Sequence, residues 1–233
     1  MKSITKLFAF GDSFVMGSGL EANPNNVSYL SWPFILGEKL KVEYTGNYGI
    51  AGGSNKRTVY KFFLTLPDIL KCDPTKTLII FSWTGIARTC LYDDKVGDYF
   101  NMLPEFHDKK NDRIKIKEFY YAYVHREVDA VMNFYVQMNT IATYLNHLNV
   151  KWFFVRSFNE IHDIVRSPRF PKAFHSLVPK DKFFLGWDNS IQEQICRNEG
   201  LICPDQYHPS ESGHARIAEL MTYYMKKEKM LDA

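Results

Sequence analysis

Ser13 lies in a turn that directly follows an apolar segment, in the stretch FAFGDSFVMGSGL from Phe8 to Leu20. A serine hydroxyl is a weak nucleophile at neutral pH and needs a neighbouring base before it can attack a carbonyl carbon. The turn therefore has two interpretations, a simple chain reversal or the position of a nucleophile. This stretch alone does not decide between them.

A candidate base lies near the other end of the chain, in the stretch CPDQYHP. Asp205 and His208 are separated by two residues in a turn that precedes a helical pattern. Such a pair can place a carboxylate against Nδ1 of the imidazole, which fixes the tautomer and stabilises the imidazolium that forms when Nε2 accepts a proton. Taken alone, the pair is more typical of a helix cap beside a surface histidine.

Apolar segments alternate with helical patterns along the chain, and each apolar segment is nearly continuous. This pattern is typical of a parallel sheet covered by helices on both faces, in which sites form beyond the carboxyl ends of the strands. We therefore expect the turns GDS, GIAGGSN, WTGIAR and CPDQYHP to gather at one edge. The predicted strands are residues 4–10, 42–48, 77–83, 151–157 and a short one near 201–202. The predicted helices are residues 32–40, 56–70, 127–147, 188–199 and 210–227. Asp188 is the expected cap of the helix over 188–199.

Three blocks of the sequence resemble the SGNH/GDSL hydrolase family in the family's order: FAFGDSFVMG, NYGIAGGSN and DQYHPSESGH. The resemblance implies a three-layer α/β/α sandwich with a flavodoxin-like parallel sheet of about five strands. It also implies that Ser13 is the nucleophile, with Asp205 and His208 as its partners. The oxyanion would be held by the backbone N–H groups of Ser13 and Gly52, with Gly53 as the near alternative to Gly52. Both glycines can equally serve a turn that needs a positive φ.

The family's third block does not match. Members usually carry a Gly-x-Asn-Asp-like turn whose Asn donates to the oxyanion, and here the turn after the third strand reads SWTGIAR without an Asn. Losing one such donor typically costs about 10²–10³ in rate. The candidate replacements, which we also treat as substrate-binding residues, are Asn55, Thr84 and Arg88, together with the backbone N–H of Gly85. For Arg88 a structural ion pair is an alternative. The WT…R and GGSN patterns also resemble SGNH-like proteins encoded by bacteriophages.

Length and composition favour one domain over residues 1–233. The chain has 45% hydrophobic residues, enough for one sizeable α/β core. Two segments interrupt the alternation of strands and helices, near residues 89–124 and 158–185. Insertions of this kind form lids or binding loops, or ordinary surface elaboration.

Several classes of function are disfavoured. The formal net charge is +3 and the basic residues are dispersed, so we expect neither a nucleic-acid partner nor a membrane surface, and no apolar run reaches the ~20 residues that span a bilayer. The N-terminal segment reads as a strand and not as a signal peptide, so we expect a cytoplasmic protein, or a virion-associated one if a phage encodes it. The four cysteines indicate a reduced chain, with a disulfide between Cys196 and Cys203 left open.

These observations favour an ester hydrolase without metal or organic cofactor. Because the insertions are polar and aromatic, we expect a small acyl ester, such as an O-acetyl group on a carbohydrate, as substrate. An SGNH-like module that binds a glycan or acts as an accessory protein, with weak or no catalysis, is the alternative, and the missing Asn motivates it. A flavodoxin-like nucleotide or flavin binder is a third reading, because GIAGGSN could cradle a phosphate, but the phosphate-loop spacings are not matched.

Overall fold

A parallel sheet lies at the centre of the computed structural model, which describes residues 3–20, 26–94, 97–104, 112–158 and 172–231. Its strands are β1 (Lys6–Gly11), β2 (Tyr44–Gly49), β3 (Thr77–Trp83) and β6 (Lys151–Arg156), in the order β2-β1-β3-β6. All neighbours pair in parallel, so the carboxyl ends of the strands meet at one edge. The three-layer α/β/α fold with a parallel sheet is therefore confirmed.

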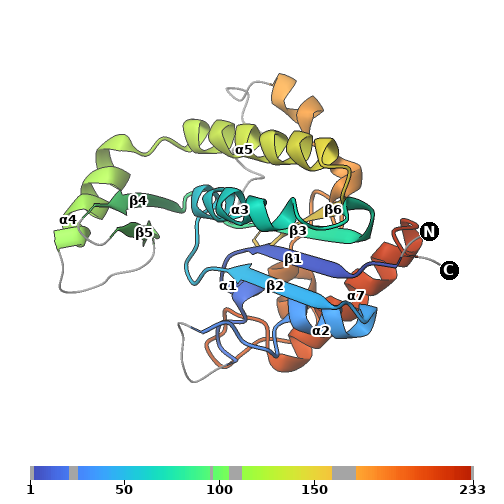
Figure 1. Cartoon of the computed structure of the whole chain (residues 1–233). Helices are drawn as coiled ribbons and strands as arrows, with labels where there is room; N and C mark the ends of the chain where they lie inside the picture. Colours follow the sequence, from blue (N-terminus) through green and yellow to red (C-terminus); the bar gives the residue numbers. More distant parts are fainter. Residues whose placement is uncertain (1–2, 21–25, 95–96, 105–111, 159–171, 232–233) are drawn as a thin grey trace.

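Alternation of side chains along β1 explains why both faces of the sheet are covered. Phe8 and Phe10 pack into a core beneath α3 (Asn55–Ile69) and α5 (Glu127–His147), whereas Leu7 and Ala9 pack into a second core against α2 (Trp32–Leu40) and α7 (Glu211–Lys227). Successive residues of a strand point to opposite faces, so a strand between two helical layers must be apolar throughout. Figure 1 shows α3 and α5 on one side of the sheet and α2 and α7 on the other.

The sheet has four strands in the part of the chain that the structure describes, and the expected short strand near residues 201–202 is not among them. Ile202 instead forms an isolated antiparallel bridge with Pro209. The N–H of Cys203 donates to the carbonyl of His208 at 2.7 Å, and the N–H of Ser210 donates to that of Leu201 at 3.1 Å. The backbone groups of this segment are therefore used within its own loop, which fixes the turn before α7.

The helix predicted over residues 188–199 is shorter and of a different type. Residues Gln192–Arg197 form a π-helical segment, η5, and the first turn is capped by Ser190, whose hydroxyl accepts from the N–H of Glu193 at 3.2 Å. Asp188 lies in the preceding turn.

The helices predicted over 32–40, 56–70, 127–147 and 210–227 agree with α2, α3, α5 and α7 within one residue at each end.

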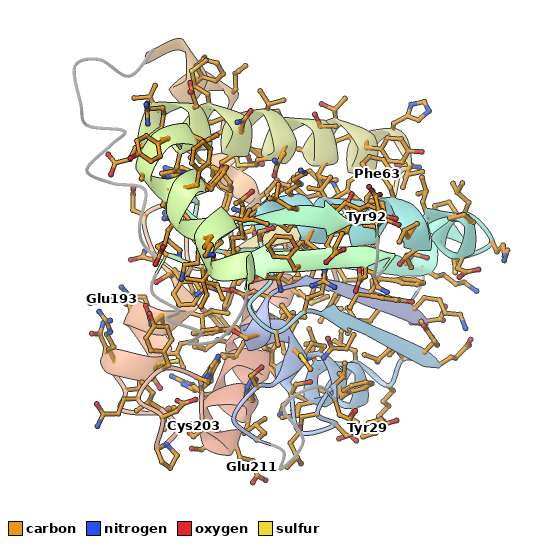
Figure 2. The ribbon with its side chains drawn as sticks, turned by 90° about the vertical axis from the view of Figure 1, so that its left-hand side faces the viewer. Tyr29, Phe63, Tyr92, Glu193, Cys203 and Glu211 are labelled. Carbon is orange, nitrogen blue, oxygen red and sulfur yellow. The ribbon has the colours of Figure 1, made fainter. Side chains whose placement is uncertain are left out.

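The first insertion forms a hairpin and a helical segment beside the carboxyl edge. The hairpin consists of β4 (Thr89–Asp93) and β5 (Asp98–Met102), and α4 (Asp112–Phe119) continues into a π-helical turn, η2 (Tyr120–Val124). The hydroxyl of Tyr121 lies 2.7 Å from the carbonyl oxygen of Ala87 and 2.9 Å from that of Met102, which ties η2 to the hairpin. In Figure 2 the carboxyl edge faces the viewer, with the hairpin and Tyr92 on the α3/α5 side and Cys203 on the α7 side.

The remaining elements are short. They are α1 (Ser13–Met16) and the 3₁₀ turns η1 (Pro74–Lys76), η3 (Lys172–Leu177) and η4 (Lys180–Lys182). Residues 105–111 of the first insertion and 159–171 of the second lie outside the described residues. All four cysteines lie within the described residues and are free thiols. No helix in the described ranges is both long and apolar enough to cross a bilayer.

A buried histidine joins α7 to α2. Ser31, at the start of α2, makes no side-chain capping bond, and the N–H of Trp32 instead donates to Nδ1 of His214 at 3.1 Å. Burial of the ring, with a smaller contribution from His208, lowers the pKa of His214 from 6.5 to about 3. The ring is therefore neutral at neutral pH, as an acceptor at Nδ1 must be.

We expect His214 to make the fold sensitive to acid. Its folded pKa lies below its unfolded pKa, so the unfolded chain binds the extra proton first, and stability present above pH 6.5 is lost as the pH falls toward 3. The free energy of unfolding should fall by about 1.4 kcal/mol per pH unit from this group. In denaturant titrations at several pH values, the free energy of unfolding of His214→Gln should fall less steeply with falling pH than that of the wild type. His147 is exposed, so His147→Gln should match the wild type. Equal pH slopes for all three proteins would contradict this.

Candidate active site

Ser13 is placed by the abrupt end of β1. The strand ends at Gly11, and Asp12 caps α1 by accepting the N–H of Phe14 on Oδ1 at 3.0 Å. Ser13 is therefore the first residue of α1, held at the carboxyl edge of a central strand. A side-chain oxygen at the N-cap satisfies a backbone donor that would otherwise have no intrahelical partner.

The turn before α7 brings its histidine to this serine. Nε2 of His208 lies 3.0 Å from Oγ of Ser13, and Nδ1 of His208 lies 2.6 Å from Oδ2 of Asp205. The other carboxylate oxygen of Asp205 accepts the backbone N–H groups of Tyr207 and His208 at 2.8 and 3.0 Å. Chain segments 195 residues apart thus form one hydrogen-bonded row, from carboxylate through imidazole to hydroxyl.

The ionisation of Asp205 follows from these contacts. Partial burial alone would raise the pKa of its carboxyl group. The hydrogen bond to the His208 ring and the two backbone N–H donors outweigh burial, and the pKa lies below its usual value of 3.8. Asp205 is therefore a carboxylate at neutral pH, able to orient the imidazole and to stabilise its protonated form.

Two glycines allow the close approach that this geometry needs. Gly19 has a φ of +91°, and a Cβ there would lie 3.2 Å from Sγ of Cys203 and 3.4 Å from Oδ2 of Asp205. At Gly49, the last residue of β2, a Cβ would lie 2.6 Å from Cα of Met16 in α1. The loop after α1 thus packs directly on the Asp205 turn, and α1 packs directly on β2.

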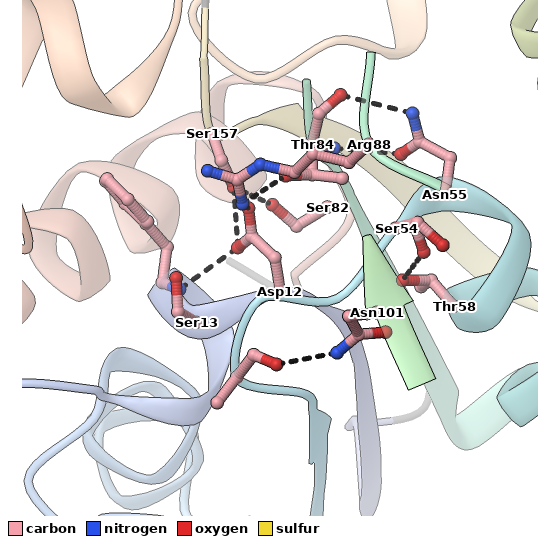
Figure 3. Close-up of polar contacts among 12 residues, drawn as sticks. Asp12, Ser13, Ser54, Asn55, Thr58, Ser82, Thr84, Arg88, Asn101 and Ser157 are labelled. Atoms are coloured by element: carbon pink, nitrogen blue, oxygen red, sulfur yellow. Dashed lines mark hydrogen bonds and ion pairs between the residues drawn. The ribbon is translucent and has the colours of Figure 1, made fainter. Parts of the chain in front are cut away.

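A second polar group surrounds the buried carboxylate of Asp12. Oδ1 accepts the hydroxyl of Ser157 at 3.0 Å, and that hydroxyl lies 2.9 Å from the hydroxyl of Ser82. NH1 of Arg88 lies 3.8 Å from Oδ2 of Asp12, and the Arg88 side chain is only 8% exposed. The guanidinium carbon also lies 4.4 Å from the centre of the Phe158 ring. Figure 3 shows the guanidinium above Asp12.

The residues proposed to replace the missing Asn form one connected group. Asn55 donates to the carbonyl of Thr84 at 3.1 Å and accepts the N–H of Thr84 at 2.9 Å, so its amide braces the backbone after β3. The Thr84 hydroxyl accepts from NH1 of Arg88 at 3.0 Å. Asn55 and Thr84 are thus already engaged in holding the chain and the guanidinium (Figure 3). Of the three, Arg88 retains donors, NH2 and Nε, that bond to no group in the described residues.

The expected oxyanion donors differ in their hydrogen bonding. The N–H of Gly53 donates to the carbonyl of Ile50 at 2.9 Å. Within the described part of the chain, no such bond engages the N–H of Gly52 or of Ser13. Gly52 has a φ of +61°, as a turn glycine does, and the adjacent carbonyl of Ala51 accepts from Nδ2 of Asn101 at 2.9 Å. The free N–H favours Gly52 over Gly53 as a donor.

Sequence reasoning missed three residues that position the site: Asp12, Ser157 and Asn47. Asn47 donates to the carbonyl of Val15 at 2.7 Å and to the hydroxyl of Ser31 at 2.9 Å, which ties β2 to α1 and α2. Both Asp12 and Asn47 lie inside the motifs quoted above, so a polar residue at the end of a buried strand was the available signal. Ser157 had no local signal, because its partner Asp12 is 145 residues away.

Comparison with known proteins gives a family and a fold. Among curated proteins, no sequence matches this chain. A family model described as a family of unknown function, DUF6071, matches residues 19–218. This chain belongs to the DUF6071 family. The matched region includes Asp205 and His208 and begins after the Gly11-Asp12-Ser13 turn.

Several solved structures are similar to this DUF6071 chain over nearly its whole length. One is described as a lipolytic protein of the G-D-S-L family from Desulfitobacterium hafniense DCB-2, with a TM-score of 0.53, 14% identity, and coverage of 94% of this chain and 98% of that chain. TesA has a TM-score of 0.52, 15% identity and coverage of 95% and 98%. A lipase/acylhydrolase from Enterococcus faecalis has a TM-score of 0.50, 14% identity and coverage of 97% of both chains. The fold is therefore that of the SGNH hydrolases.

Replacing Gly19 should test the contact between its loop and the Asp205 turn. Gly19→Ala introduces both positive-φ strain and a tight contact with the turn, with the new Cβ 3.2 Å from Sγ of Cys203. Gly200 has a φ of +69° and open space around it, so Gly200→Ala introduces the strain alone. Both should lose about 1–2 kcal/mol of stability from strain. Only Gly19→Ala should shift the imidazole resonances of His208 in NMR spectra. The same shift in both variants, or in neither, would contradict the packing described.

Proposed function

We propose that this protein is a serine ester hydrolase of the SGNH/GDSL type. The observation that carries the proposal is the hydrogen-bonded row from Asp205 through His208 to Ser13, with distances of 2.6 and 3.0 Å. A hydroxyl, a base within reach of its proton and a carboxylate that orients the base are the parts that nucleophilic catalysis by serine requires. The SGNH hydrolase fold of the chain supports the same reading.

The reaction proceeds through an acyl-enzyme. Oγ of Ser13 attacks the ester carbonyl carbon while Nε2 of His208 takes the hydroxyl proton. The tetrahedral intermediate collapses as His208 returns that proton to the leaving alkoxide, which departs as the alcohol. Water then attacks the acyl-Ser13 ester with His208 as base, and the carboxylic acid leaves as Ser13 regains its proton. Asp205 holds Nδ1 throughout and stabilises the imidazolium formed in each half-reaction.

The oxyanion of each tetrahedral intermediate is stabilised by the N–H groups of Ser13 and Gly52 and by the cation of Arg88. The family's Asn is absent from the turn after β3. Arg88 ends that turn, and its NH2 and Nε donors bond to no group in the described residues. Asp12 and Thr84 hold its guanidinium before substrate arrives, so little reorganisation is needed as charge develops. Arg88 therefore serves as the third donor.

A small acyl group, such as an O-acetyl group on a carbohydrate, is the substrate that fits best. Ser13 is only 5% exposed, and the ring of the next residue, Phe14, packs edge-to-face on that of Phe158 with ring centres 4.9 Å apart. The absent Asn favours one alternative, an SGNH-like glycan-binding or accessory protein with little or no catalysis. The two functions differ in whether Ser13 is activated.

Labelling with a fluorophosphonate tests the activation of Ser13. We expect the wild-type protein to react at Ser13, because His208 removes the hydroxyl proton, and to hydrolyse p-nitrophenyl acetate about 10⁴-fold or more faster than Ser13→Ala. The matched control is Ser18→Ala, which removes a nearby hydroxyl and should behave as wild type. A folded wild-type protein that stays unlabelled would favour the accessory-protein alternative.

Substitution of Arg88 tests the third oxyanion donor. Arg88→Lys keeps the charge beside Asp12 and should lower kcat by about 10²–10³-fold with little change in KM, because the guanidinium donors act mainly in the transition state. Arg88→Met also leaves the Asp12 carboxylate without its cation, so its stability must be measured alongside its kinetics. The exposed Arg197→Met is the control. An unchanged kcat in well-folded Arg88→Lys would remove Arg88 from the mechanism.

A further inference from the structure

A polar cavity of about 440 Å³ lies beside the candidate active site, on the α3/α5 side of the carboxyl edge. It is bordered by the start of α3, the segment after β3, the start of β4, the π-helical turn η2 and the first half of α5. Its polar lining includes the side chains of Asn55, Lys56, Arg88, His125, Asn133 and Gln137. A cavity of this volume is in the range of small-molecule sites.

The lining is basic. Lys56 and Arg88 carry positive charge, His125 adds an imidazole, and no acidic side chain of the described residues contributes to the wall. The nearby acid Asp98 is paired with Arg57 at 2.9 Å, and Oδ2 of Asp12 lies 3.8 Å from NH1 of Arg88. Lys56 forms no ion pair with a carboxylate of the described residues, so its charge is available to a ligand. Lys56 also lies in the first turn of α3, where the positive end of the helix dipole adds to the attraction for an anion. The cavity therefore favours a ligand with a negative charge.

Other groups in the wall fit hydroxyls and a sugar ring. Oε1 of Gln137 is buried and accepts no hydrogen bond from the described residues, so a ligand hydroxyl could donate to it. Asn133 supplies a further amide and Tyr120 an aromatic ring. Tyr120 belongs to a π-helical turn, a rare geometry that is frequent at functional sites. An anionic ligand that also carries hydroxyl groups would use all of these contacts.

Arg88 connects the cavity to the reacting groups. It lines the cavity, and its guanidinium lies beside Asp12, the residue that precedes Ser13. We propose that this cavity is a substrate subsite that binds an anionic sugar group, so that the ester cleaved at Ser13 is carried by a sugar with a carboxylate or phosphate. The identity of the cavity as a substrate subsite rests on the proposed esterase function, whereas its ligand chemistry does not.

Calorimetric titration with three sugars tests the ligand chemistry without any ester. The probes are methyl glucuronide, glucose 6-phosphate and methyl glucoside. Methyl glucoside is the uncharged control sugar. We expect at least one anionic sugar to bind at least tenfold more tightly than the glucoside; the first two probes tell a carboxylate from a phosphate. Lys56→Gln should weaken that binding about fivefold or more, and Lys61→Gln, further along α3, should not. Equal affinity for all three sugars, no binding, or equal effects of the two variants would overturn the proposal.

Hydrolysis of acetylated sugars tests the assignment as a substrate subsite. Lys56→Gln should lower kcat/KM for an acetylated glucuronide or glucose 6-phosphate by the factor by which it weakens binding, and should leave hydrolysis of p-nitrophenyl acetate unchanged. Selective binding by a protein that hydrolyses no ester would overturn the esterase function and leave the anionic sugar site. Hydrolysis with no preference for anionic sugars would overturn the subsite alone.

Discussion

The contact between the hydroxyl of Ser13 and the imidazole of His208 depends on the direction of the sheet. Parallel strands place all their carboxyl ends at one edge, and this edge receives the turn after β1 as well as the turn before α7. The ends of β1 and β2 are also held together there, because Gly49 allows α1 to lie directly on β2. Without that close packing Ser13 would have no fixed position relative to His208.

Charge is arranged in two rows that meet at α1. In one row, Asp205 is ionised and exposed enough to be solvated, and it orients His208. In the other, the fully buried carboxylate of Asp12 has the nearly buried guanidinium of Arg88 3.8 Å from Oδ2, and Oδ1 accepts the hydroxyl of Ser157. Removing one member of a buried ion pair is far more costly than losing an exposed pair, so the second row is a structural constraint as well as a source of positive charge.

The strands of the parallel sheet and the helices α2, α3, α5 and α7 were predictable because each is decided by its own residues. The apolar stretch of residues 77–83 and the helical spacing over 127–147 coincide with β3 and α5. The pairing of Ser13 with His208 followed from the order of the motifs in a parallel α/β chain. Residues whose roles depend on distant partners were not predictable: Ser157, His214 and the Asn55–Thr84 brace are recognised only through contacts between remote segments. The segment near residues 201–202 has an apolar sequence, yet it pairs within its own loop, which no local pattern reveals.

In the proposed mechanism Ser13 forms a covalent acyl intermediate with the help of His208. Rapid acid quenching during the hydrolysis of p-nitrophenyl acetate, followed by peptide mass spectrometry, observes this species directly. We expect one acetyl group on the peptide that contains Ser13 in the wild-type protein and none in His208→Ala quenched at the same time. Hydrolysis without acetylation of Ser13, or acetylation of a different residue, would contradict it.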